Sequence, residues 1–132
     1  MAHFLMDDLT QFLRRAAETP FDWAATDCLS WLGEWVAVRH GVNPHVRYRD
    51  RYATRTGAYR LIAEHGSRQA LIDAAVAPLG LLRTDAPQRG DIALVGAPEG
   101  ELGAIVTGAF TACLEQRGLR FRRAPILAAW RV

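Results

Sequence analysis

Apolar positions recur at helical spacing over the first half of the chain and at strand-like spacing over the second half. Before Gly80 they return three or four positions apart, and Gly or Pro ends each run. After Pro87 the apolar runs become shorter, and Gly-containing turns separate them. The pattern predicts helices at 7–18, 27–40 and 56–65, a fourth helix capped by Ser67, and strands at 91–95, 102–107, 109–114 and 119–122. Helices followed by an antiparallel meander indicate an α+β fold.

The helix expected from residues 27 to 40 is apolar around most of its circumference, which predicts a central, buried position. Thr26 or Asp27 supplies a side-chain oxygen for its N-cap. The segment 41–44, which reads Gly-Val-Asn-Pro, supplies the stop. Trp23, Trp31 and Trp35 are expected in the core, with contact to a bound ligand as the alternative.

Cys28 falls in the first turn of this helix and is the candidate nucleophile of the chain. Unpaired backbone N–H groups and the helix dipole stabilise a thiolate at such a position, and the thiolate is the reactive form of cysteine. The alternative is that Cys28 is a small, inert side chain packed among Leu and Trp residues. The sequence leaves both readings open.

The loop at 41–54 alternates arginine and tyrosine, and these residue types are enriched at protein interfaces. A partner-binding surface is therefore one hypothesis for this loop, with the arginines solvated or paired with Asp50 as the other. The candidate binding residues are Arg47, Tyr48, Arg49, Arg51 and Tyr52.

Composition limits the classes of function. The 132 residues fit one domain spanning 1–132, 50% of them hydrophobic and 23% charged. A net charge of +2 is too small to indicate a nucleic-acid partner, and no apolar run reaches the ~18 residues that would span a bilayer. The N-terminus lacks a basic region before its apolar residues, so we expect no signal peptide and synthesis in a reducing cytoplasm. Two Cys and four His residues show no metal-ligand spacing, and no phosphate-binding loop is present, so neither metal nor cofactor is expected.

Two dipeptides carry a resemblance: Asp27-Cys28, which opens the central helix, and Gly90-Asp91, which precedes the first strand. In their order and spacing they resemble the NlpC-type papain-like cysteine peptidase superfamily, from about residue 20 to 107. With Arg51-Tyr52 and the C-terminal 129–132, Ala-Trp-Arg-Val, the chain is more closely similar to a small group encoded among phage and prophage tail genes. The resemblance implies a papain-like domain of N-terminal helices followed by a small antiparallel sheet.

One departure from that superfamily concerns catalysis. Its catalytic histidine begins the second strand, where this chain reads Glu101-Leu102-Gly103. His40 lies on the same helix as Cys28, about 18 Å away at 1.5 Å per residue, and His45 shares that distance unless the loop folds back. His3 and His65 match no catalytic position of the superfamily.

The resemblance therefore implies a phage tail-tip or baseplate component, or a tail assembly protein, whose NlpC-like fold is catalytically inactive. The expected partners are other tail-tip proteins, such as hub and distal tail proteins, and the expected location is the tail tip of the virion. One alternative is an active cysteine peptidase that cleaves peptidoglycan during cell-wall penetration. Another is a non-catalytic module that binds a peptide or a glycan. No nucleic acid or membrane is expected as a partner.

Overall fold

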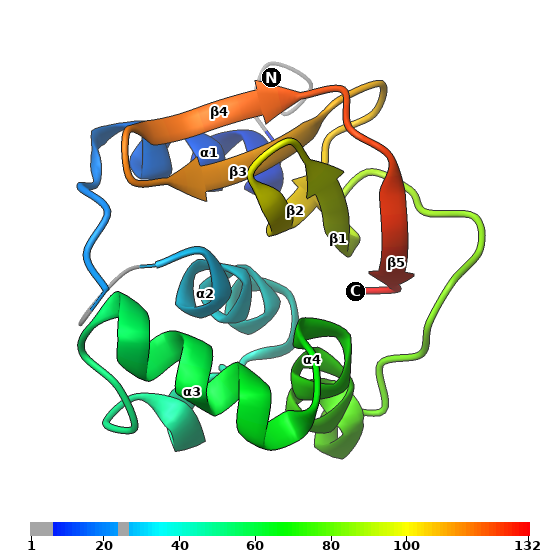
Figure 1. The fold of residues 1–132 in the computed structure, drawn as a ribbon. Coiled ribbons are helices and arrows are strands. Elements are labelled where there is room, and N and C mark those ends of the chain that lie inside the picture. Colours follow the sequence, from blue (N-terminus) through cyan, green and yellow to red (C-terminus); the bar gives the residue numbers. More distant parts are fainter. Residues whose placement is uncertain (1–6, 24–26) are drawn as a thin grey trace.

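The computed structural model of the protein describes residues 7–23 and 27–132. Within these ranges the chain is α+β, as predicted, with helices first and an antiparallel sheet after them (Figure 1). The α-helices are α1 (Asp8–Glu18), α2 (Cys28–His40), α3 (Arg55–His65) and α4 (Arg68–Val76). Two short 3-10 helices, η2 (Val46–Tyr48) and η3 (Ala77–Leu79), follow α2 and α4.

Local capping explains why the helices begin and end where the sequence predicted. The side chains of Asp7 and Ser67 accept hydrogen bonds from backbone N–H groups in the first turns of α1 and α4. Asp27 does the same for α2, whereas the alternative cap, Thr26, lies outside the described residues. Gly41 ends α2 in the left-handed conformation, at φ 79°, which glycine adopts at no steric cost.

A single antiparallel sheet has the strand order β4-β3-β2-β1-β5. The last strand was not predicted as such, because the sequence indicated only that the apolar residues near the C-terminus would dock. Those residues form an edge strand that pairs with β1. The strands are β1 (Ile92–Ala97), β2 (Gly100–Val106), β3 (Thr111–Glu115), β4 (Gly118–Arg122) and β5 (Ile126–Trp130).

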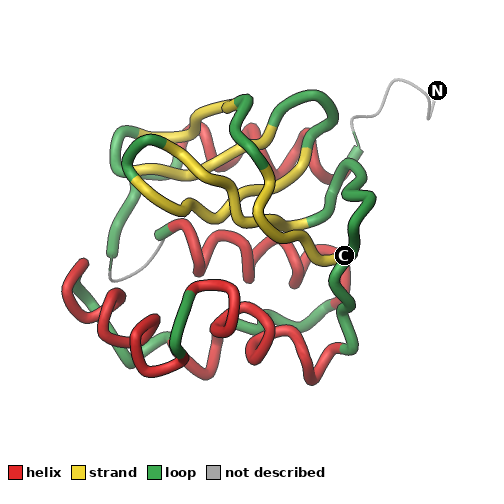
Figure 2. Tube along the Cα trace, turned by 45° about the vertical axis from the view of Figure 1, so that its right-hand side comes forward, coloured by secondary structure: helices red, strands yellow, loops and turns green. Residues whose placement is uncertain are grey.

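Helix α2 lies between the sheet and the α3–α4 pair, and both views show this arrangement (Figures 1 and 2). Trp31, Trp35 and Val36 are almost fully buried, which confirms the predicted central helix. Phe12 of α1 packs against both tryptophans, with ring centroids 5.6 and 5.4 Å apart. The Trp35 indole N–H donates to the Gly90 carbonyl at 2.7 Å and so ties α2 to the segment that enters β1.

Asp91 joins the start of β1 to the C-terminus. Its carboxylate is buried and accepts hydrogen bonds from the backbone N–H of Val132, at 3.0 Å, and from Arg131 Nε, at 3.1 Å. Trp130, also buried, donates its indole N–H to Asp73 of α4 at 2.8 Å. These contacts give a structural role to the Gly-Asp and Ala-Trp-Arg segments singled out in the sequence. In the described part of the chain, no helix combines the length and apolarity needed to cross a membrane.

Candidate functional site

Cys28 is the first residue of α2, directly after the N-cap Asp27, as the sequence predicted. The Asp27 carboxylate accepts from the Ser30 backbone N–H at 2.8 Å, and the Ser30 hydroxyl accepts from the Asp27 backbone N–H at 2.9 Å. This reciprocal capping box fixes the backbone on both sides of the cysteine. Local sequence therefore places the cysteine at the start of the helix.

The Cys28 side chain is partly buried and lines a cleft with a volume of about 500 Å³. One wall includes Tyr59 of α3 and Trp23, which lies in the segment between α1 and α2. Glu101 and Leu102 of β2 belong to the opposite wall, together with the β3–β4 hairpin. A cleft of this size and mixed lining is typical of a site for a small ligand or a short peptide.

The environment of Cys28 favours the neutral thiol. Burial, which disfavours the charged form, is the main reason that its pKa rises to about 11, and the neighbouring Asp27 carboxylate raises the pKa further. A hydrogen bond from the Gly103 backbone and the positive charge of Arg68 act in the opposite direction, but they are the weaker influences. At neutral pH the thiol is therefore protonated and a poor nucleophile.

No histidine of the described residues lines this cleft. His40 ends α2, and the ring of His65 lies 3.0 Å from the Leu61 carbonyl. His3 lies outside the described residues. The cleft wall formed by β2 carries Glu101, a carboxylate that cannot stabilise a thiolate.

His45 does fold back along α2, but it reaches Tyr52 and not the thiol. The Tyr52 hydroxyl lies 2.5 Å from the Asp27 carboxylate and 2.9 Å from His45 Nε2. Since its single proton is donated to Asp27, the hydroxyl accepts from His45, whose Nε2 must carry a proton. Burial lowers the pKa of His45 and, with the Asp27 charge, raises the pKa of Tyr52.

This Asp27–Tyr52–His45 chain was not predicted from the sequence. Its effect on the neighbouring cysteine is electrostatic: the anchored Asp27 carboxylate lies beside Cys28 and disfavours a thiolate. An active dyad would offset that charge with an imidazolium next to the sulfur. In this protein the imidazole lies on the far side of Tyr52 and helps to hold the carboxylate in place.

Gly33 allows the loop to return along α2. A methyl group at this position would overlap Asn43 Oδ1 and lie 2.8 Å from His45 Cβ. Asn43 Oδ1 in turn accepts from the His45 backbone N–H at 2.9 Å, so Gly33 lies beneath the turn that orients His45. A glycine within a helix of large residues is the signal in the sequence that marks this close approach.

We expect Gly33→Ala to lower the free energy of unfolding by about 1–3 kcal/mol, because overpacking against the loop displaces Asn43 and His45. Helix propensity alone predicts the opposite sign, a gain of about 1 kcal/mol. Urea unfolding of the wild type, Gly33→Ala and the double variant Gly33→Ala/Asn43→Ala measures the effect. A stabilised Gly33→Ala variant would show that the loop does not pack on this helix face.

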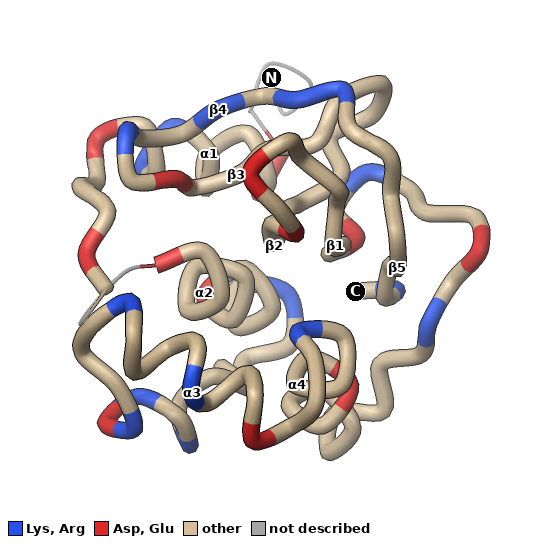
Figure 3. The backbone as a smooth tube through the Cα atoms, viewed as in Figure 1, with Lys and Arg blue, Asp and Glu red and all other residues tan. Residues whose placement is uncertain are grey.

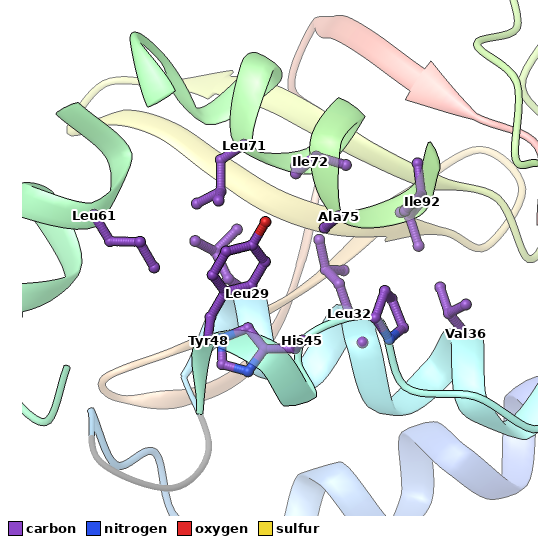
Figure 4. A pocket seen from close by; sticks show the side chains of 13 residues that line it. Leu29, Leu32, Val36, His45, Tyr48, Leu61, Leu71, Ile72, Ala75 and Ile92 are labelled. Atoms are coloured by element: carbon purple, nitrogen blue, oxygen red, sulfur yellow. The ribbon is translucent and has the colours of Figure 1, made fainter. Parts of the chain in front are cut away.

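The predicted partner surface at 41–54 requires a correction for its two tyrosines. Tyr48 and Tyr52 are only 6% and 8% exposed, so their rings are not available to a partner. Figure 4 shows Tyr48 among Leu29, Leu61 and Leu71, where it fills the space between α2, α3 and α4. Their burial follows from the return of the loop onto the helices, which the Arg-Tyr alternation did not reveal.

The three arginines of that prediction lie at the surface and have separate contacts. Arg47 donates to the Ala74 carbonyl of α4 and lies over the Tyr48 ring, 5.1 Å from its centroid. Arg51 forms an ion pair with Glu64 of α3 at 2.7 Å. Arg49 is exposed and lines a small pocket together with Glu34.

The fold and the site together define an α+β domain in which a helix-capping carboxylate and a protonated cysteine face an open cleft. The chain belongs to the family described as domain of unknown function (DUF6950), whose sequence profile matches residues 5–132. No curated protein and no solved structure matches the chain.

Proposed function

We propose that this protein is a catalytically inactive, NlpC-like domain that serves as a component or assembly factor of a phage tail tip. The observation that carries the inactive part of the proposal is the state of Cys28. The cysteine holds the position of a papain-like nucleophile, but its thiol is protonated at neutral pH and no described histidine lines its cleft. The tail-tip part rests on the resemblance of Asp27-Cys28, Arg51-Tyr52, Gly90-Asp91 and residues 129–132 to the tail-gene group.

The proposal makes other tail proteins, such as hub and distal tail proteins, the natural partners. The protein would be made in the bacterial cytoplasm and would reside at the virion tail tip, unless it acts only during assembly. Detection of the protein in purified particles separates these two roles: a structural component remains with the tail, whereas an assembly factor is absent from it.

The competing proposal is an active cysteine peptidase acting on peptidoglycan, which the exposure of Cys28 to an open cleft would favour. A general base contributes about 10²–10⁴-fold to such a reaction, and oxyanion donors stabilise its transition state. The helix N-terminus offers donors, but the cleft offers no described imidazole. Turnover without a base is expected to be too slow to serve phage entry.

We expect Cys28→Ser to leave infectivity unchanged in the phage that encodes this protein. The substitution removes the nucleophile but preserves a small side chain at the start of α2. Plaque counts and DNA delivery measure function, while thermal unfolding of the isolated protein checks for the cost of about 1–3 kcal/mol that an unpaired buried hydroxyl brings. Cys28→Ala is the matched control without a hydroxyl. If folded Cys28→Ser particles assemble normally but fail to deliver DNA, the catalytic proposal is correct.

A further inference from the structure

The wall of the cleft that faces the sheet carries a row of aromatic rings, from the segment before α2 and from α3. Phe21 packs edge-on against Trp23, with centroids 4.9 Å apart, and Trp23 packs edge-on against Tyr59, at 6.4 Å. Tyr59, in α3, is 42% exposed. A rigid aromatic row of this kind offers apolar contact area at low entropic cost.

Tyr59 also positions two positive charges. Arg55 and Arg68 lie on its ring, with guanidinium carbons 5.3 and 5.4 Å from the centroid, and Arg55 Nε donates to the Tyr59 hydroxyl at 3.2 Å. Among the described residues neither guanidinium forms an ion pair with a carboxylate, and residues 1–6 and 24–26 contain no Asp or Glu. Stacked guanidinium groups of this kind are preorganised and keep donors available for an anion.

The sheet wall carries an ion-paired cluster and two further arginines. Arg122 binds Glu115 through two hydrogen bonds of 2.7 Å and contacts Glu99 at 3.2 Å, so one positive charge is shared between two carboxylates and the cluster keeps one net negative charge. Arg117 and Arg120 of the β3–β4 hairpin form no ion pair with any acidic side chain of the described chain. Figure 3 shows basic segments along β4 and at the first residues of α3 and α4.

The lining of the cleft has five arginines and four carboxylates, one of them the buried Asp27, so its charge balance is positive by one. Four of the lining arginines have no carboxylate partner among the described residues: Arg55, Arg68, Arg117 and Arg120. Of the three glutamates in the lining, Glu101 is the one that forms no ion pair within the described residues. The positive charges occupy both walls, and the aromatic row lies on one of them. A ligand that matches this arrangement bears separate negative charges on both sides of an apolar group.

We infer that the cleft beside Cys28 binds an acidic segment of a partner protein, with carboxylates at the arginines and an apolar side chain on the Trp23–Tyr59 rings. This inference rests on the proposed non-catalytic function and names the partner chemistry of the same cleft. A volume of about 500 Å³ admits a few residues of extended chain. A polyphosphate backbone fits less well, because it carries a charge at every unit and would also meet Glu99, Glu101 and Glu115, whereas a peptide can place its carboxylates at the arginines alone.

Binding of a model peptide tests the inference on the intact protein. The probe is a fluorescein-labelled hexapeptide with a Trp-Leu centre and two glutamates on each side, and its matched control has glutamine in place of every glutamate. Fluorescence anisotropy at low ionic strength measures both affinities. We expect the wild type to bind the glutamate peptide at least about 10-fold more tightly than the glutamine peptide, since opposite charges on both walls attract it.

Paired variants locate the binding site. Arg68→Gln/Arg120→Gln removes one charge from each wall and is expected to abolish the preference for the glutamate peptide. Arg14→Gln/Arg60→Gln makes the same change in net charge at exposed positions that do not line the cleft and is expected to retain the preference. Circular dichroism and thermal unfolding establish that both variants are folded. Equal affinity of the wild type for the two peptides, or equal loss in both variants, would overturn the inference.

Soluble peptidoglycan fragments provide the competing arm. Displacement of the labelled peptide by these fragments at lower concentration than by the unlabelled glutamate peptide would also overturn the inference, in favour of a cell-wall ligand. The result of the peptide-binding experiment can be distinguished from that of the proposed function, because the proposed function is tested by the infectivity of Cys28→Ser particles. Infectious Cys28→Ser particles with no acidic-peptide binding would refute this inference alone, whereas non-infectious ones would refute the proposed function whatever the peptide does.

Discussion

Asp27→Ala is expected to lower the free energy of unfolding by about 3 kcal/mol or more, the largest loss of stability that we predict for one side chain. The substitution removes the N-cap of α2, worth about 1 kcal/mol. It also leaves the buried Tyr52 hydroxyl without its acceptor, which costs a further 1–3 kcal/mol or so. Urea unfolding followed by circular dichroism measures the loss, which corresponds to a fall in Tm of roughly 10 °C.

Ser67→Ala is the matched control, because it removes the N-cap of α4 at an exposed position with no further partner on the hydroxyl. Its expected cost is about 1 kcal/mol. Tyr52→Phe removes only the hydroxyl and is expected to fall between the two. If Asp27→Ala costs no more than Ser67→Ala, the Asp27–Tyr52–His45 chain contributes nothing to stability, and Asp27 is only a helix cap.

The helices could be predicted well from the sequence because their boundaries depend on neighbouring residues. Asp27 with Ser30 starts α2 and Gly41 ends it, and each signal acts within one turn. The strands β1 to β4 follow each other through short turns and were predicted for the same reason. Strand β5 was not, since its partner β1 lies far away in the sequence and the pairing depends on buried Asp91 and Trp130.

Prediction of the site was limited by contacts that the sequence pattern does not encode. Cys28 could be placed at the start of α2, but the raised pKa of its thiol depends on burial within the folded chain. The return of His45 depends on the absence of a side chain at Gly33.

The reactivity of Cys28 gives the second large effect. We expect iodoacetamide to modify Cys28 at neutral pH about 100-fold more slowly than a cysteine of ordinary pKa, because a rise from 9.0 to about 11 reduces the thiolate fraction by that factor. The rate should increase about tenfold for each unit of pH up to the limit at which the protein unfolds. Mass spectrometry of peptides from native protein, quenched at intervals, measures the rate at Cys28 separately from that at the buried Cys113.

The same labelling experiment is the most direct test of the central claim that the Cys28 thiol is not an activated nucleophile. Asp27→Asn, which keeps a side-chain oxygen for the helix cap but removes the adjacent negative charge, serves as the electrostatic control and is expected to label faster than the wild type. The account predicts slow modification of native Cys28 that rises steadily with pH and shows no plateau near neutrality. Rapid modification with a plateau below pH of about 7, the behaviour of a thiolate paired with a base, would contradict it.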